Sequence, residues 1–260
     1  MNIPLEHDSF FLPGKRPEGV LVLHGLTSTP AAVRIICNPL NYSGLFVLGP
    51  RLPGHATNPE DMKNYSWKDW LEATQKAYVY LQRYCSKIHM IGFSMGANLA
   101  FCLSVIPEYP VEKIVSIGIP MKLYQDWYIR FGTAVYSLFS DYYQKPSTPR
   151  HMMFYNSTGT YTVWPYKGIK EMFRGIEVTK KVLPNVTSET LFISSKEDPI
   201  IDKRSSIIAS NMMTLNDSKK HAYVVDDRSH LPTHGLHRDT VIETIQNFLD
   251  GNLDEKQLHL

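Results

Sequence analysis

A lone serine stands between two glycines in the stretch Gly92-Phe93-Ser94-Met95-Gly96. The stretch follows an apolar run and opens a helical pattern, which is the setting of a nucleophile elbow. A sharp strand-to-helix turn strains the backbone of its central residue, and the glycines avoid collisions with the neighbouring strand and helix. Free N–H groups at the helix start favour negative charge beside the hydroxyl. We therefore expect Ser94 to be an exposed nucleophile.

A serine hydroxyl becomes a good nucleophile only when a base takes its proton and a third group orients that base. Asp198 follows one apolar run, and His230 follows the next one by a short loop. Because open sheets gather their chemistry at the carboxyl ends of the strands, we expect both side chains near Ser94. The order serine, acid, histidine is one of the chain orders in which triads occur. Glu197 and Asp202 are alternative carboxylates.

Two further histidines, His234 and His237, follow His230 closely. Three histidines could suggest a metal site, but Pro232 and Gly235 interrupt any regular helix that would present them together. No well-spaced carboxylate completes a ligand set either. We therefore expect neither a metal nor a cofactor. His234 remains a rival base, although His230 is better placed.

Backbone amides that stabilise an oxyanion would complete such a site. One donor is usually the amide after the nucleophile, and the other lies in the turn after an earlier strand. The run that ends in His24-Gly25 makes such a turn, so the expected donors are the N–H groups of Met95 and Leu26. The alternative is that this His-Gly pair only ends a strand.

Short apolar runs alternate with helical patterns along most of the chain. The expected strands are 20–24, 45–49, 88–92, 114–119, 190–194 and 222–226, with an edge strand at 9–12. The expected helices are 30–40, 67–84, 95–105, 202–213 and 240–249, the first capped by Thr29. Continuous apolar strands are buried on both faces, which predicts an α/β fold with a mostly parallel central sheet flanked by helices.

Residues 121–189 break this alternation. They hold 14 of the 30 aromatic residues of the chain, although most of these are expected simply to pack this segment onto the body. A long insertion with its own apolar residues between two strands is typical of a lid. We predict a core formed by 1–120 and 190–260 and a helical lid insertion at 121–189.

Composition excludes several other classes. The net charge of +2, without a basic run, gives no argument for nucleic acid. The N-terminal residues lack the pattern of a signal peptide, and no apolar run reaches membrane-spanning length. Three cysteines without a C-x-x-C spacing are expected to be buried and reduced. We therefore predict a soluble, cytoplasmic protein without stable membrane insertion, and we leave its oligomeric state open.

Six segments spread over 20–249 match one known group of enzymes. They read LVLHGLTSTPAAVR, GPRLPGHATNPEDM, WKDWLE, GFSMGA, SSKEDPII and SHLPTHGLHRDTVIETIQNFL. On these segments the chain resembles the bacterial α/β-hydrolases of the carboxylesterase and monoacylglycerol lipase family. The resemblance implies an α/β-hydrolase fold with a lid where the insertion lies, and it fades within that insertion.

The same resemblance implies Ser94 as nucleophile, Asp198 as orienting acid and His230 as base, in preference to His234. It also assigns the oxyanion amides to Leu26 and Met95. Three positions depart from the family pattern without removing a catalytic group: Ser28, Ala56 and Ala97 stand where relatives have glycine. His55 in the same segment as Ala56 is expected to be structural.

These observations predict a serine carboxylic-ester hydrolase that works through an acyl-enzyme intermediate. The expected substrate is a small-molecule acyl ester, such as a monoacylglycerol or a similar short-to-medium chain ester. Lysophospholipase or acyl thioesterase activity on the same triad is an alternative, and so is a non-hydrolytic ligand-binding role. A nucleotide-binding protein is disfavoured because neither G-x-G-x-x-G nor a P-loop follows the first strand.

Overall fold

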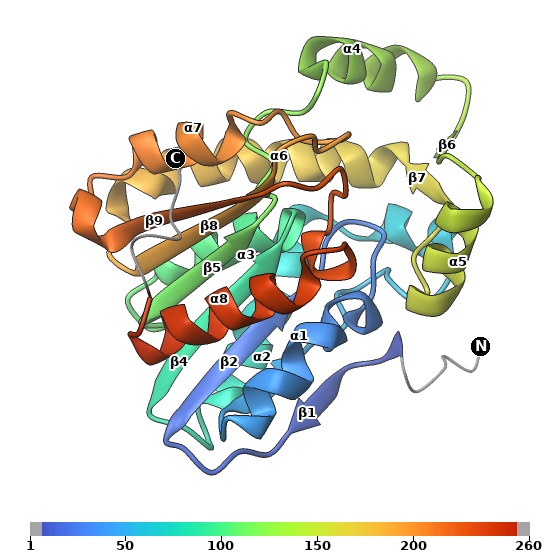
Figure 1. Cartoon of the computed structure of the whole chain (residues 1–260). Helices are drawn as coiled ribbons and strands as arrows, with labels where there is room; N and C mark the ends of the chain where they lie inside the picture. Colours follow the sequence, from blue (N-terminus) through green and yellow to red (C-terminus); the bar gives the residue numbers. More distant parts are fainter. Residues whose placement is uncertain (1–6, 254–260) are drawn as a thin grey trace.

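The computed structural model describes residues 7–253 and contains a central seven-stranded sheet (Figure 1). The strands are β1 (Phe10–Leu12), β2 (Glu18–Leu23), β3 (Phe46–Gly49), β4 (Lys87–Phe93), β5 (Lys113–Ile117), β8 (Glu189–Ser195) and β9 (Lys220–Val225). They lie in the order β1-β3-β2-β4-β5-β8-β9, and only β1 runs antiparallel to its neighbour. The expected mostly parallel sheet and its edge strand are confirmed. Residues 1–6 and 254–260 belong to the predicted core but lie outside this range, and so does part of the N-terminal segment that is predicted not to be a signal peptide.

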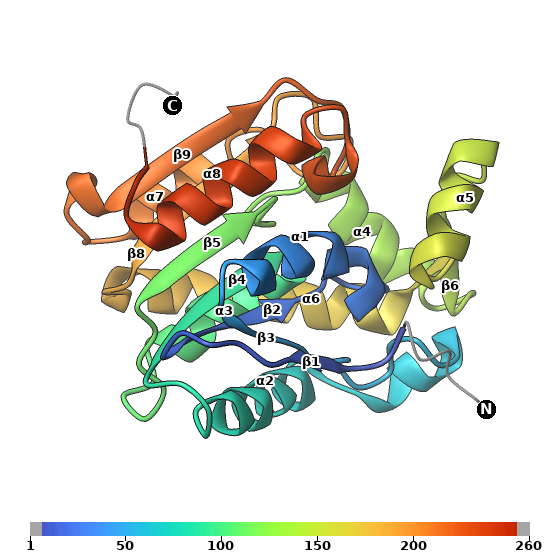
Figure 2. The ribbon, with the colours of Figure 1, turned by 60° about the horizontal axis from the view of Figure 1, so that its bottom comes forward.

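Helices cover both faces of the sheet, as the sequence predicts (Figure 2). Their bounds are α1 (Pro30–Tyr42), α2 (Trp67–Leu81), α3 (Met95–Ser104), α7 (Ser205–Met212) and α8 (Arg238–Asp250). Short 3-10 turns lie at η2 (Pro59–Asn64), η3 (Leu183–Asn185), η4 (Asp217–Lys219) and η5 (Pro232–His234). At the start of α1, the Thr29 hydroxyl accepts a hydrogen bond from Ala31 N at 3.2 Å, which confirms the predicted cap.

Two hydrophobic layers lie on opposite faces of the sheet because successive strand residues point in opposite directions. Val20 and Val22 of β2 pack with α1 and α8, whereas Leu21 and Leu23 pack with α2 and α3. All four side chains are buried. This explains why the strands read as continuous apolar runs rather than as alternating ones.

The segment between β5 and β8 contains three α-helices and a small separate two-stranded sheet. Its elements are α4 (Asp126–Tyr136), β6 (Tyr142–Gln144), α5 (Pro149–Thr158), β7 (Val163–Pro165) and α6 (Tyr166–Val182), with β6 antiparallel to β7. The last helix belongs to the layer that covers the sheet: Ile176 is fully buried, and Asn98 of α3 donates to the Thr179 hydroxyl at 3.1 Å. The division at 121–189 into core and lid remains a prediction.

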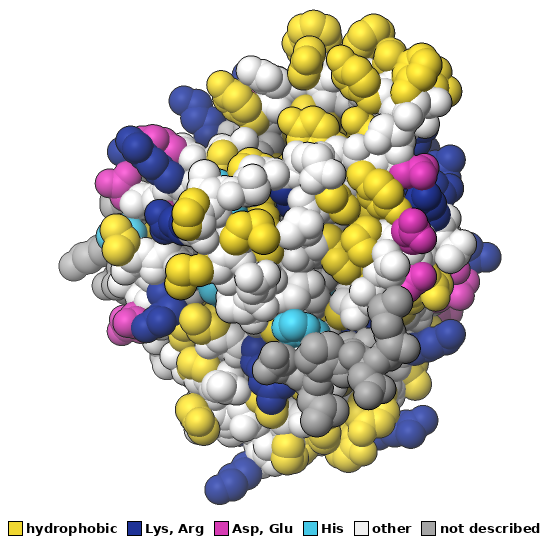
Figure 3. Space-filling view, turned by 90° about the vertical axis from the view of Figure 1, so that its right-hand side faces the viewer, with side chains coloured by type: hydrophobic (Ala, Val, Ile, Leu, Met, Phe, Trp, Pro, Cys, Tyr) yellow, Lys and Arg dark blue, Asp and Glu magenta, His cyan; other side chains and the backbone are white. Residues whose placement is uncertain are grey.

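Helix α4 stands out from the body and carries much exposed apolar surface. Figure 3 shows hydrophobic side chains gathered at the top of the molecule, where α4 lies in Figure 1. Trp127, Phe131, Leu138 and Phe139, on α4 and just after it, are all more than half exposed. These side chains therefore do not serve the main core.

The first turn of α3 lies in close contact with the sheet. A Cβ atom added at Gly96 would lie 2.4 Å from the carbonyl oxygen of Leu23, and one at Gly92 would lie 2.4 Å from Ala97 N. Both distances are far inside van der Waals contact, so only glycine fits at either position. This confirms the packing role that the sequence pattern predicts for the two glycines.

Gly96→Ala is expected to lower the free energy of unfolding by roughly 1–3 kcal/mol, because the added methyl group must displace backbone. Gly132→Ala on α4 is the matched control, since the nearest atom to its added Cβ lies at 3.6 Å. Alanine there should stabilise by up to about 1 kcal/mol through helix propensity. Urea unfolding of both variants checks this, and equal stabilities would contradict the proposed contact.

Candidate active site

Ser94 occupies a strained turn between β4 and α3. Its backbone has φ +52° and ψ −120°, a conformation that residues other than glycine rarely adopt. The surrounding structure holds it there: Ser94 N donates to Ile117 O at 2.8 Å, and Ala97 N donates to Ser94 O at 2.8 Å. Within residues 7–253 the Ser94 hydroxyl makes no hydrogen bond. The strained conformation predicted for this position is therefore present. The exposure predicted for Ser94 is wrong, because the neighbouring strand ends and loops leave the residue only 8% exposed.

His230 and Asp198 form a short hydrogen bond. Nδ1 of His230 lies 2.6 Å from Oδ2 of Asp198, and both side chains are largely buried. The other carboxylate oxygen of Asp198 accepts from Ile200 N at 2.8 Å and from Ile201 N at 2.9 Å. Burial raises the pKa of Asp198, but the charge and hydrogen bond of His230 and the two amides outweigh it and hold that pKa below 3.8. The carboxylate is therefore ionised and oriented.

The loops after β8 and β9 are tied together, which keeps this pair in place. Ser195 Oγ donates to Ser229 O at 2.6 Å, directly beside the histidine. Lys196 N donates to Val225 O at 2.9 Å. Two strand ends that are far apart in sequence thus present the acid and the histidine to one another, as the topology of a parallel sheet allows.

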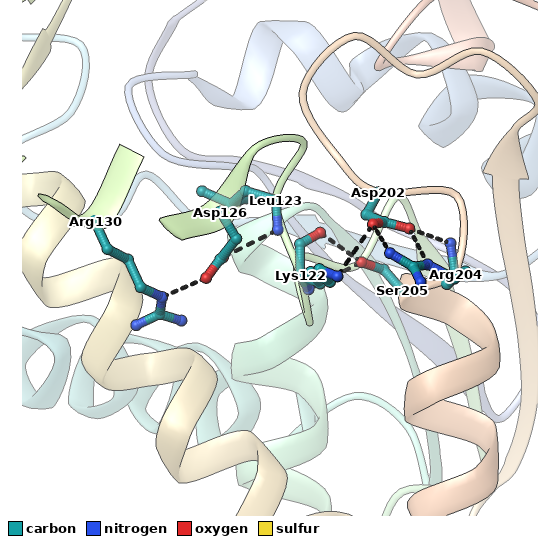
Figure 4. Close-up of polar contacts among 7 residues, drawn as sticks. All are labelled: Lys122, Leu123, Asp126, Arg130, Asp202, Arg204 and Ser205. Carbon is teal, nitrogen blue, oxygen red and sulfur yellow. Dashed lines mark hydrogen bonds and ion pairs between the residues drawn. The ribbon is translucent and has the colours of Figure 1, made fainter. Parts of the chain in front are cut away.

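The two alternative carboxylates have other partners. Glu197 is half exposed and pairs with Arg228 at 2.9 Å. Asp202 accepts from Arg204 at 2.7 Å and lies 3.6 Å from Lys122 Nζ (Figure 4). The Arg204 hydrogen bonds keep the pKa of Asp202 well below its usual range. Neither group contacts His230.

The same network anchors the start of the insertion beside the Asp198 loop (Figure 4). Ser205 Oγ donates to Lys122 O at 2.7 Å and accepts from Lys122 N at 3.0 Å. One residue further on, Leu123 bridges to Ile201, whose amide holds Asp198. The beginning of the insertion and the orienting carboxylate are therefore connected through Ile201.

Ser94 and His230 both lie at the carboxyl end of β5. Ser94 binds Ile117 at the end of this strand, and a Cβ at the next residue, Gly118, would lie 3.2 Å from Cε1 of His230. The rings of Phe93 and His230 are 4.9 Å apart. No hydrogen bond joins Ser94 to His230 in the part of the chain that the structure describes. Such contacts are often long without substrate and shorten in the reactive complex.

The other histidines of this loop lie apart from the carboxylate. Nδ1 of His234 contacts the Thr233 hydroxyl at 3.3 Å, and its ring packs against Phe154 at 5.4 Å. Burial lowers the pKa of His234. His237 precedes the first residue of α8. Between residues 7 and 253, no cluster of three or more metal-binding side chains is found.

The turn after β2 lies against the elbow. A Cβ added at Gly25 would lie 3.2 Å from the Cβ of Ser94. The amides of Leu26 and Met95 have no hydrogen-bond partner among the described residues, so both are free to donate. The fully buried His24 braces this turn: its Nε2 accepts from Leu52 N at 3.1 Å, and its Nδ1 contacts Gly25 O at 3.0 Å. Burial lowers the pKa of His24 to about 4, so the ring is neutral.

The sequence does not predict a role for two residues near this turn, Lys145 and Thr27. Lys145 of the insertion is buried and donates to the Thr27 hydroxyl at 2.5 Å. Thr27 has φ +61° and donates in turn to Leu26 O at 2.6 Å. Nothing in the sequence around Lys145 distinguishes it from a surface lysine, because its burial arises only from this long-range contact.

His55 and the three cysteines are buried, as the sequence predicts for structural residues. His55 is fully buried, contacts Pro53 O at 3.1 Å and packs against the His24 ring, which agrees with a structural role. The three cysteines are free thiols and buried, as predicted. No helix found between residues 7 and 253 combines the length and the apolar character needed to cross a membrane.

Comparison with known proteins agrees with this architecture. Residues 19–163 match the family described as alpha/beta hydrolase fold. A thermostable monoacylglycerol lipase of Bacillus sp. (strain H-257) is 38% identical over 88 residues, which is 34% of this chain and only 35% of that lipase. A carboxylesterase of Bacillus subtilis (strain 168) is 24% identical over 234 residues, covering 90% of this chain and 92% of that protein.

Solved structures show the same fold. A structure of the metagenome-derived lipolytic enzymes LipS and LipT superimposes with a TM-score of 0.84 at 22% identity, covering 96% of this chain and all of that one. A monoacylglycerol lipase of Paleococcus ferrophilus superimposes with a TM-score of 0.77 at 12% identity, covering 94% and 98% of the two chains. The family match covers more than half of the sequence. The chain therefore belongs to the alpha/beta hydrolase fold family.

Proposed function

We propose that this protein hydrolyses carboxylic esters through Ser94, His230 and Asp198. The observation that carries the proposal is the 2.6 Å contact between His230 Nδ1 and the buried Asp198 carboxylate, at the same carboxyl edge of the sheet as the strained Ser94. With Nδ1–H donated to Asp198, the lone pair of His230 lies on Nε2. That atom has no other partner in residues 7–253 and is available to the serine hydroxyl.

In the proposed reaction, Nε2 of His230 takes the hydroxyl proton while Ser94 Oγ attacks the ester carbonyl. The ionised Asp198 stabilises the imidazolium that forms. The free amides of Leu26 and Met95 donate to the oxyanion of the tetrahedral intermediate. The imidazolium then protonates the leaving alcohol, which leaves an acyl-enzyme, and water attacks this ester with the same histidine as base.

We propose that the substrate is an acyl ester such as a monoacylglycerol. We also propose that the protein is cytoplasmic. Two observations support the substrate: the aromatic insertion adjoins the turn that carries Leu26, and the relatives include a lipase named for monoacylglycerol. We further propose that the outer part of the insertion serves as a lid over the acyl chain.

Ser94→Ala is expected to reduce kcat on p-nitrophenyl esters by on the order of 10⁴-fold or more, with unchanged thermal unfolding. The measurement is a series from acetyl to palmitoyl esters, whose preferred chain length reports the space under the insertion. Ser104→Ala, at the end of the same helix, is the matched control and should be fully active. Full turnover by Ser94→Ala would exclude the mechanism, and faster hydrolysis of acyl thioesters or lysophospholipids would redirect the substrate class.

Asp198→Asn is expected to lower kcat by roughly 10⁴-fold, because an amide does not hold the required imidazole tautomer. Glu197→Gln, which removes only an exposed ion pair with Arg228, should leave kcat within about twofold. Burial raises the pKa of Asp198, but His230 and the two amides lower it below its ordinary value, so this carboxylate should not produce an acid limb in a rate profile near neutral pH. Equal losses in the two variants would contradict the assignment of Asp198.

A further inference from the structure

Lys145 is a buried cation with an unusual environment. It is 8% exposed, and its ammonium lies over the rings of Trp164 and Tyr155, 5.1 Å and 5.4 Å from their centroids. Its one hydrogen-bond acceptor among the described residues is the Thr27 hydroxyl, and none of their carboxylates forms an ion pair with it. Burial lowers the pKa of Lys145 from 10.5 to about 7. Because a buried charge without a counterion costs free energy, such a lysine is a poor choice for stability alone.

The contact joins the insertion to the turn that carries one of the proposed oxyanion donors. Thr27 Oγ1 accepts from Lys145 and donates to Leu26 O at 2.6 Å, so the hydroxyl is held from both sides. Since Thr27 has φ +61°, the peptide between residues 26 and 27 needs external support to stay in this orientation. That peptide directly follows the Leu26 amide.

Other contacts place the insertion firmly on the same turn. Tyr161 N donates to Thr27 O at 2.9 Å, and Thr29 Oγ1 donates to Thr158 O at 2.5 Å. These contacts fix the backbone of the insertion beside the turn. Lys145 donates to the Thr27 hydroxyl, which in turn donates to Leu26 O. Of these contacts, the one made by Lys145 changes when the lysine loses its proton.

We propose that Lys145 is a positioning residue for the hydrolysis proposed above: through Thr27 it orients the turn so that Leu26 N–H faces the carbonyl oxygen of the substrate. The inference rests on the proposed function, because it assigns Leu26 to the oxyanion site. It assigns a second role to the insertion, which is to orient an oxyanion donor through Lys145 as well as to cover the site.

Protonation of Lys145 supplies a distinctive readout. The groups that face it are Thr27 from the turn after β2, Tyr155 from α5, Trp164 from β7 and His55 from the loop after β3. Burial raises the pKa of Tyr155 and lowers that of His55, so both are neutral near pH 7. The ammonium is therefore the charge that is lost here as the pH rises through about 7, and the neutral amine is a weaker donor to Thr27.

Lys145→Met tests the proposal with the full-length protein and p-nitrophenyl butyrate. We expect kcat to fall by about 10–100-fold, less than for the loss of an entire oxyanion donor, with KM within about twofold. The melting temperature should stay level or rise, because the variant removes an uncompensated buried charge. We expect wild-type kcat to decrease above about pH 7 as the ammonium is lost, and we expect no such decrease in the variant. Lys170→Met is the matched control, since Lys170 also donates to a hydroxyl of the insertion, Ser137 at 2.7 Å, but is exposed.

Thr27→Val and the double variant that combines it with Lys145→Met show whether Lys145 acts through Thr27. If it does, the double variant loses no more kcat than the worse single variant. The proposal would be overturned if the kcat losses of the two single variants multiply in the double variant. It would also be overturned if Lys145→Met leaves kcat unchanged, changes KM alone, or loses kcat together with a lower melting temperature. Ser94→Ala separates this from the main function: full activity in that variant refutes the triad, whereas wild-type kcat in Lys145→Met with an inactive Ser94→Ala refutes only the role of Lys145.

Discussion

The site depends on one close contact, that between the first turn of α3 and the carbonyl oxygen of Leu23 on β2. Because Gly96 lacks a side chain, the helix begins directly against the strand, and the chain must turn within one residue. Ser94 occupies that turn with φ +52°, a strained conformation held by hydrogen bonds on both sides. The same contact brings the turn that follows β2 beside the serine, so a single packing constraint positions both the hydroxyl and a free backbone amide.

Much of this arrangement was predictable from local patterns. The strands and helices of the body follow from apolar periodicity and from the Thr29 cap, and the elbow follows from the spacing of its two glycines. The position of Asp198 just after an apolar run favoured it over two neighbouring carboxylates, Glu197 and Asp202, and the resemblance to a known family gave the same residue and preferred His230 to His234. The structure distinguishes the three carboxylates by their partners, since Glu197 pairs with Arg228 and Asp202 pairs with Arg204, whereas Asp198 contacts His230.

The insertion was the least predictable part. In helix α6, Ile169, Phe173 and Ile176 recur at helical spacing and are buried against the body, which is a weak signal, and no helix bounds were predicted there. Lys145 carries none: its partner Thr27 lies 118 residues earlier, and a lysine between tyrosines and a proline is ordinarily exposed. Contacts of this kind arise from tertiary packing, so a polar residue type gives no hint of them.

The exposed helix α4 has a separate consequence. The insertion is anchored to the Asp198 loop at its start and to the turn after β2 further along, whereas α4 lies between these anchors and contacts mainly α6, for example through Arg130 and Glu177. Substitutions on the outer face of α4 can therefore accumulate without disturbing the groups that surround Ser94. If α4 covers the substrate as proposed, this separation allows descendants of this chain to change the molecules they accept through α4 and to retain the groups around Ser94.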